Sequence, residues 1–207
     1  AYFLKELDPS ARIVLLEMDR IGHGASGRNA GMLCPGFDHS YELSIDHFGL
    51  EEATRLERIG LENGREAALF GSDCDIEENG MLNVALLPEH IEIHKAILEA
   101  AEMLGIEGCS LMSAEEVRHE LRSPLYKGGL YNKYGAIVNP YKMALKLQRE
   151  ITFRGVSVYE STPVERIEGS RIYTPGGDVQ AQKVILATDA YTHHIEPSVL
   201  KWYVPVY

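Results

Sequence analysis

Apolar positions near the start of the chain form a short continuous run. Ile13 to Leu16 are all apolar, and Glu17 follows them directly. An unbroken run of this length is typical of a strand that is covered on both faces, as in a parallel sheet. Residues 1–7 read as the end of a helix, which Asp8-Pro9-Ser10 stops. The order of helix, turn, strand and acid predicts the second half of a βαβ unit, so we expect a first strand and its glycine turn to lie upstream.

Helical spacing of apolar residues recurs further along the chain. It predicts helices over residues 39–70, from Pro88 to residue 104, and from Asn139-Pro140 to near Gly155. Ser113 and Glu116 form a capping box, which predicts a short helix ending at residue 121. His90 and His94 lie four apart on the second of these helices. Without a third ligand in the pattern, we interpret them as solvent-facing and predict no metal site.

Strand-like segments alternate with these helices. Residues 81–87, 126–138 and 156–160 have the β-branched, aromatic and glycine content of strands and turns. Residues 171–174 and 178–181 flank Pro175-Gly176-Gly177 and predict a hairpin. The apolar run 183–188 predicts a buried strand, and residues 202–206 begin another. The mixture indicates an α/β (α+β mixed) fold.

Glycines follow Glu17 in a pattern with two interpretations. Gly22, Gly24 and Gly27 spell G-x-G-x-x-G, the fingerprint of a dinucleotide-binding turn. That fingerprint needs a helix to open at its last glycine, so that the helix N-terminus faces the pyrophosphate. Residues 28–36 are rich in Gly and Pro, which disfavours such a helix. An NAD(P)-dependent dehydrogenase that uses these three glycines remains an alternative and requires a helix directly after Gly27.

The longer string from Gly24 to Gly31, Gly-Ala-Ser-Gly-Arg-Asn-Ala-Gly, is more specific. With the preceding strand and acid, it resembles the FAD-dependent oxidoreductases related to D-amino-acid oxidase, glycine oxidase and sarcosine oxidase. The resemblance implies that Glu17, with Met18 behind it, meets the adenosine ribose. It also implies that a set of residues in the string lines the phosphates and the flavin ring: Ala25, Ser26, Arg28, Asn29, Ala30, Gly31 and Met32.

Two later segments also resemble this family. Residues 135–140 resemble the segment that leads back into the nucleotide domain, and Val164 matches a valine whose backbone contacts adenine. Ala187 and Thr188 match a string that closes over the cofactor, usually Ala-Thr-Gly-Ala. Asp189 replaces the glycine of that string. Some relatives that oxidise amines such as glutamylated polyamines carry Asn there.

The resemblance covers nearly the whole chain but only about half of a typical family member. It implies a Rossmann-like FAD-binding domain built from residues 1–40 and 140–207. Residues 41–139 would form an inserted helical segment and part of a substrate domain of mixed sheet plus helices, both domains being incomplete. The implied reaction is oxidation of the C–N bond of an amine or amino acid by hydride transfer to flavin. Substrate-holding groups belong mostly to the other half, so the catalytic residues are unknown.

Composition narrows the remaining possibilities. The 207 residues are 45% hydrophobic and 25% charged, as in ordinary globular proteins. A formal charge of −11 argues against a nucleic-acid or anionic-membrane partner. The family resemblance implies a small-molecule amine or amino acid as the substrate. Three separated cysteines and the absence of a membrane-length apolar run favour the cytoplasm. A noncatalytic remnant that has lost its cofactor is the remaining alternative, and the oligomeric state is open.

Overall fold

The computed structural model describes residues 1–37 and 40–202 and divides into two compact units. Unit 1 contains Ala1–Arg28 and Ala144–Tyr207, and unit 2 contains Asn29–Met143. Unit 1 is therefore built from the two ends of the chain, and unit 2 is one continuous segment inserted between them. The first boundary lies 12 residues before the predicted domain limit at 40/41, and the second lies 4 residues after the limit at 139/140. The predicted limits remain a prediction.

Unit 1 begins with the predicted helix, turn and strand. Helix α1 (Tyr2–Leu7) is followed by β1 (Val14–Leu16), which pairs in parallel with β7 (Ser157–Tyr159). Helix α6 (Pro140–Phe153) precedes β7 and belongs to this unit from Ala144 onward. This arrangement confirms the order of elements. The expected cover on both faces of β1 is wrong for Val14, which is 44% exposed.

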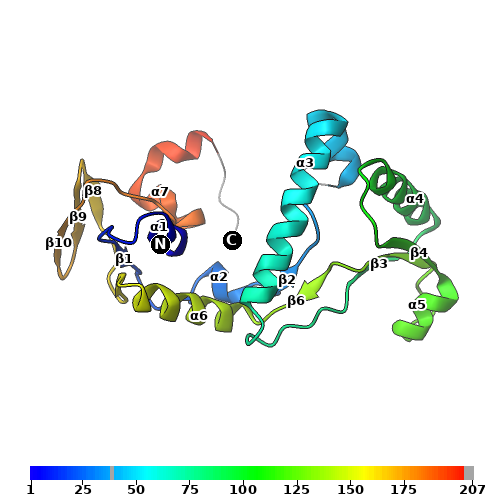
Figure 1. Ribbon diagram of the computed structural model, residues 1–207, viewed down its shortest axis with the longest axis horizontal. Helices are drawn as coiled ribbons and strands as arrows, with labels where there is room; N and C mark the ends of the chain where they lie inside the picture. Colours follow the sequence, from blue (N-terminus) through cyan, green and yellow to red (C-terminus); the bar gives the residue numbers. More distant parts are fainter. Residues whose placement is uncertain (38–39, 203–207) are drawn as a thin grey trace. The chain divides into compact units, whose positions relative to one another are not determined.

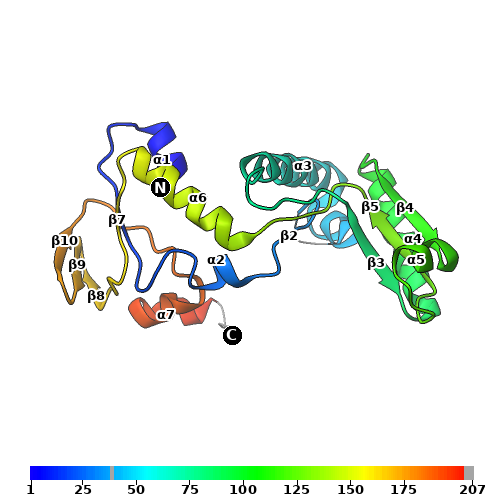
Figure 2. The ribbon, with the colours of Figure 1, turned by 90° about the horizontal axis from the view of Figure 1, so that it is seen from below.

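The rest of unit 1 is a small antiparallel sheet followed by short helices. The sheet has the order β10 (Gly177–Gln180), β9 (Arg171–Thr174), β8 (Arg166–Glu168), which confirms the predicted hairpin (Figure 2). After it come the 3₁₀ helix η1 (Asp189–Tyr191), α7 (Thr192–Ile195) and the 3₁₀ helix η2 (Pro197–Lys201).

The predicted buried strand over residues 183–188 does not form. This stretch is irregular, and its central residues Val184, Ile185 and Leu186 are 40%, 68% and 40% exposed. An apolar run becomes a strand only when a neighbouring strand supplies hydrogen-bonding partners, and no described residue pairs with this one. The strand predicted from residue 202 falls almost wholly outside the described residues; Trp202 itself follows η2.

Unit 2 contains a three-stranded antiparallel sheet. Its order is β3 (Met81–Ala85), β5 (Gly128–Asn132), β4 (Cys109–Ser113), and α4 (Pro88–Met103) and α5 (Ala114–Glu120) pack against it (Figure 1). Successive residues of a strand face opposite sides. Gly128 faces Ile91 of α4 and Gly129 faces Val117 of α5, so the two helices cover opposite faces. The glycines admit both helices at close range.

Helix α3 (Tyr41–Phe70) occupies most of the predicted helical stretch but is broken at Gly49, whose φ and ψ are 76° and 161°. His39, where the predicted helix starts, lies outside the described residues. The core of unit 2 joins α3 to α4 and the segment after α4, through Tyr41, Ala53, Ala100, Ala101, Leu104 and Ile106. A second small sheet pairs β2 (Met32–Leu33) with β6 (Ala136–Ile137).

Local capping signals in unit 2 are confirmed. The Ser113 side chain accepts a hydrogen bond from the Glu116 amide, and the Glu116 carboxylate accepts one from the Ser113 amide. The Asn139 side chain accepts a hydrogen bond from the amide of Lys142 at the start of α6. Both helix starts follow from short-range chemistry that the sequence displays directly.

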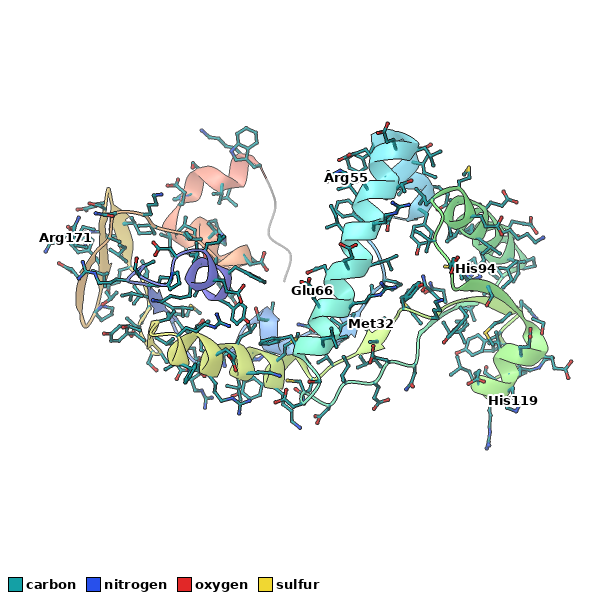
Figure 3. All side chains as sticks on the ribbon, in the orientation of Figure 1. Met32, Arg55, Glu66, His94, His119 and Arg171 are labelled. Carbon is teal, nitrogen blue, oxygen red and sulfur yellow. The ribbon has the colours of Figure 1, made fainter. Side chains whose placement is uncertain are left out.

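The solvent-facing interpretation of His94 is wrong. Its side chain is buried at 7% exposure, on the side of α4 that faces the sheet (Figure 3). Helical spacing placed His94 one turn from His90, but the buried side of α4 includes His94 with Ala101 and leaves the aliphatic Ile93 54% exposed. Its imidazole is therefore a packed side chain of unit 2.

Candidate cofactor site

The loop after β1 is held by the loop after β7. The Glu17 amide donates to the Tyr159 carbonyl over 2.9 Å, and the Thr162 amide donates to the Glu17 carbonyl over 2.8 Å. The Ser161 amide donates to the Asp19 carbonyl over 2.7 Å. Ser161 has a φ of 51°, a conformation that non-glycine residues adopt only under constraint. The parallel pairing of the strands thus continues into a fixed double loop at their carboxyl ends, where α/β folds bind ligands.

One of the two oxygens of the Glu17 carboxylate accepts a hydrogen bond from this loop. Its Oε1 accepts a hydrogen bond from the Asp19 amide over 3.0 Å, which sets the direction of the side chain. Its Oε2 is engaged by no group in the part of the chain that the structure describes. A carboxylate fixed by one oxygen and open at the other can accept hydrogen bonds from ribose hydroxyls, so Glu17 fits its predicted role. Met18 beside it is 54% exposed.

Glu160 supports the same loop and was not predicted as a site residue. Its carboxylate accepts a hydrogen bond from the Ile21 amide over 2.7 Å. The sequence does carry the signal, because Glu160 follows β7 as Glu17 follows β1. An acid after each of two paired parallel strands marks the same edge of the sheet.

The glycine loop closes on itself in a single helical turn. Gly22 has a φ of 77°, and a Cβ on Gly27 would overlap the Gly22 carbonyl, so both positions require glycine. Helix α2 (Ala25–Arg28) contains Gly27 and ends one residue after it. Residues 29–31 form no helix. The helix that an NAD(P) fingerprint needs after its third glycine is therefore missing, and these glycines act through local packing.

The surface of this loop suits a diphosphate. Gly24, Ala25 and Ser26 are exposed, and the position of a Cβ on Gly24 meets open space. The Arg28 guanidinium lies 3.2 Å from His23 Nδ1, and His23 Nε2 lies 3.3 Å from a carboxylate oxygen of Asp19. The loop therefore offers accessible backbone, a hydroxyl and a cation that can complement phosphate charge.

Asn29 to Met32 belong to unit 2 and are tightly fixed there. The Asn29 side chain accepts a hydrogen bond from the Gly31 amide over 2.8 Å, and the Gly31 carbonyl accepts one from the Val138 amide over 2.9 Å. Gly31 is buried, has a φ of 71°, and leaves no room for a Cβ beside the Val138 carbonyl. Ala30 and Met32 are exposed, and Figure 3 marks Met32. The segment thus presents side chains from a rigid backbone.

The remaining predicted residues divide into two groups. Val164 is half-buried and lies two residues beyond Thr162, which bonds the Glu17 loop. Ala187 is exposed, and Thr188 is held by its own turn: its carbonyl accepts a hydrogen bond from the Tyr191 amide. A hydrogen bond therefore holds the segment just before Val164 against Glu17, whereas the hydrogen bonds of Thr188 are local to its own turn.

The described residues lack two further kinds of feature. They contain no group of three or more His, Cys, Asp and Glu side chains that could hold a metal ion. They also contain no helix that combines the length and apolar character needed to cross a membrane.

Comparison with known proteins identifies the family. The model of the FAD dependent oxidoreductase family matches residues 1–206. Gamma-glutamylputrescine oxidoreductase of Escherichia coli (strain K12) is 29% identical over 201 residues, which is 93% of this chain and 47% of that protein. A probable oxidoreductase OrdL of Haemophilus influenzae is 27% identical over 207 residues, 95% of this chain and 47% of its own length. The chain spans about half the length of these curated relatives.

Solved structures share the fold. Glycine oxidase from Geobacillus kaustophilus superposes with a TM-score of 0.72 at 22% identity, covering 91% of this chain and 51% of that one. L-proline dehydrogenase from P. horikoshii gives a TM-score of 0.73 at 14% identity, covering 95% and 50%. The match of the family model across almost every residue, together with this shared fold, supports one conclusion: the chain belongs to the FAD-dependent oxidoreductase family.

Proposed function

We propose that this chain forms part of an FAD-dependent oxidoreductase that oxidises the C–N bond of an amine or amino acid by hydride transfer to the flavin. The observation that carries the proposal is the Glu17 carboxylate at the end of a parallel strand pair, with one oxygen fixed by the Asp19 amide. The glycine loop that follows matches the family string from Gly24 to Gly31. Membership of the family supports FAD as the cofactor.

Each predicted residue has a distinct task in this proposal. Glu17 accepts hydrogen bonds from the ribose, with Met18 packing beside it, and the Val164 backbone meets the adenine edge. Ala25, Ser26 and Arg28 complement the phosphates. Asn29, Ala30, Gly31 and Met32 contact the flavin ring through a backbone that the Asn29 side chain holds. Ala187 and Thr188 close over the cofactor.

FAD, when bound, supplies the electron acceptor for a hydride from the carbon next to the substrate nitrogen. The chain's own residues bind and orient it, and none of them is assigned to the proton or hydride steps. The amine substrate of the Escherichia coli relative makes a gamma-glutamylated amine one candidate, and glycine is a second. Assays of the complete protein with both compounds would separate these substrates.

Glu17→Ala tests the cofactor part of the proposal. Loss of the charged acceptor should weaken FAD affinity about tenfold or more, because hydrogen bonds to charged groups contribute roughly 1.5–3 kcal/mol. Affinity is measured by titrating the protein with FAD and following flavin fluorescence. Added FAD should also stabilise the unaltered protein by about 2.7 kcal/mol at a concentration one hundred times the Kd.

Glu99→Ala provides the control, since Glu99 is an exposed acid on α4 and its removal changes the net charge equally. Equal FAD affinities for the two variants would contradict the role of Glu17. A protein that shows neither binding nor stabilisation by FAD would instead support the noncatalytic remnant.

We propose the cytoplasm as the compartment, because none of Cys34, Cys74 and Cys109 forms a disulfide in the part of the chain that the structure describes. Cell fractionation with an antibody against the chain tests this assignment. Recovery in an oxidising compartment would contradict it.

A further inference from the structure

The buried carboxylate of Glu57 has no place in the proposed cofactor contacts. Glu57 lies in the second half of α3 and is 0% exposed, the largest of the fully buried side chains. Burying a carboxylate is costly unless hydrogen bonds replace its water. Here Oε2 accepts one from the Phe37 amide over 2.9 Å, and Oε1 accepts one from the Ser44 hydroxyl over 3.0 Å. The Glu57 side chain therefore contacts Phe37, which lies 20 residues before it, and Ser44, which lies 13 residues before it.

One of these segments is the loop formed by residues 34–37. Gly36 has a φ of 85°, and a Cβ there would run into the Glu57 carboxylate. Gly60, nearly one turn beyond Glu57, would place a Cβ against the Gly36 backbone. Two glycines thus let the loop lie directly on α3, and the Glu57 carboxylate holds it there through the Phe37 amide.

Helix α3, which carries Glu57, is fixed to the core of unit 2. Ser44 lies before the break at Gly49 and Glu57 lies after it, so their hydrogen bond spans the break. The Tyr41 hydroxyl accepts a hydrogen bond over 3.1 Å from the Asn132 side chain of β5. Helix α3 is therefore the fixed partner, and the loop is the element whose position Glu57 sets.

The loop is the direct continuation of the segment assigned to the flavin. Gly31 directly precedes β2, and Met32 is the first residue of β2, which pairs with β6. Residues 34–37 follow β2 at once. The start of this stretch is fixed by Asn29 and Val138, and its end by Glu57. We propose that Glu57 is a positioning residue for the flavin, holding the far end of the segment whose near end contacts the ring. The inference rests on the proposed function.

Three variants test this role. Glu57→Ala removes both acceptors, so exchange of the Phe37 amide hydrogen should accelerate about tenfold and the FAD Kd should rise about tenfold. Glu57→Gln can still accept from Phe37 and can donate to Ser44, so it should restore both values to near those of the unaltered chain. Val117→Ala is the matched control, because Val117 is also 0% exposed but packs on the sheet from α5. It should lower stability and leave both readouts unchanged.

The outcomes separate this inference from the function beneath it. Equal rises in FAD Kd for Glu57→Ala and Val117→Ala would overturn the positioning role. The weaker binding would then follow from lower stability of unit 2 in both variants. Faster Phe37 exchange with an unchanged Kd would overturn it too. If the unaltered protein binds no FAD, the proposed function fails together with the flavin role, and exchange at Phe37 still reports whether Glu57 holds the loop.

Discussion

Asp189 stands where the family string usually has glycine, and its backbone has a conformation that favours glycine. Its φ is 41°, in the left-handed region that L-residues with a Cβ occupy at a cost. A glycine at this position would adopt that conformation without the cost of a Cβ. Asp tolerates this conformation better than most side chains do, which accounts for the substitution in steric terms.

The pair Asp189→Gly and Asp189→Ala isolates that backbone cost. Both variants remove the carboxylate, so the difference between them reports the backbone alone. We expect Gly to be more stable than Ala here by about 1 kcal/mol, measured as the free energy of unfolding in denaturant.

The same pair at Glu99, inside α4, should give the opposite order, with Ala more stable by about 1 kcal/mol. An advantage of Ala at both positions would show that the left-handed conformation of Asp189 is absent in solution.

At the scale of elements, α4 carries a pH-sensitive contact with the sheet. Burial, followed by the nearby His90, lowers the pKa of His94 below its ordinary value of 6.5. The folded state thus holds the neutral imidazole, whereas the unfolded chain binds a proton at higher pH. The contribution of neutral His94 to the free energy of unfolding is therefore fully present above pH 6.5. It is lost as the pH falls through the lowered pKa of His94.

We therefore expect the free energy of unfolding to decrease below pH 6.5, and His94→Gln to flatten this decrease by removing the titrating group. Denaturant unfolding at several pH values measures it. His119→Gln serves as the control, because the His119 side chain is 90% exposed on α5 and its replacement should leave the slope unchanged. A slope that is the same in His94→Gln and the unaltered chain would contradict the assignment.

At the scale of the whole molecule, the two units differ in core. Among the described residues, the buried apolar side chains of unit 1 are Ile151, Val156 and Ile172, whereas unit 2 buries a larger set that includes Ala53, Ala101, Leu104, Val117 and Leu130. Unit 2 also has a central strand, β5, paired on both edges, while β1 and β7 pair only with each other among the described residues. Apolar burial is the dominant stabilising term, so we expect unit 2 to be the more stable unit.

Hydrogen exchange measures this difference directly. Amides of β5 should exchange more slowly than those of β1 and β7, because local opening costs least where few apolar contacts are buried. Bound FAD should narrow the gap by stabilising the loops at the ends of β1 and β7. Equal protection of β1 and β5 without FAD would contradict the difference in core.

Much of the secondary structure could be predicted because its causes are local. The capping box at Ser113, the Asn139 cap and the turn at residues 175–177 each rest on a few neighbouring residues. The glycine string after Glu17 likewise identifies the family without any knowledge of the tertiary structure. The break at Gly49 was not foreseen, since a glycine within a helical pattern is compatible with either outcome.

The sequence by itself determined the family and most of the order of elements, and it supplied the residues proposed for the cofactor site. Only the tertiary structure decided which apolar or polar residues find partners. Residues 183–186 have the pattern of a strand yet remain exposed, while His94 and Glu57 are polar yet buried. The physical reason is that periodicity depends on near neighbours, whereas burial depends on groups brought together from distant positions: Phe37 and Ser44 for Glu57, and the sheet for His94.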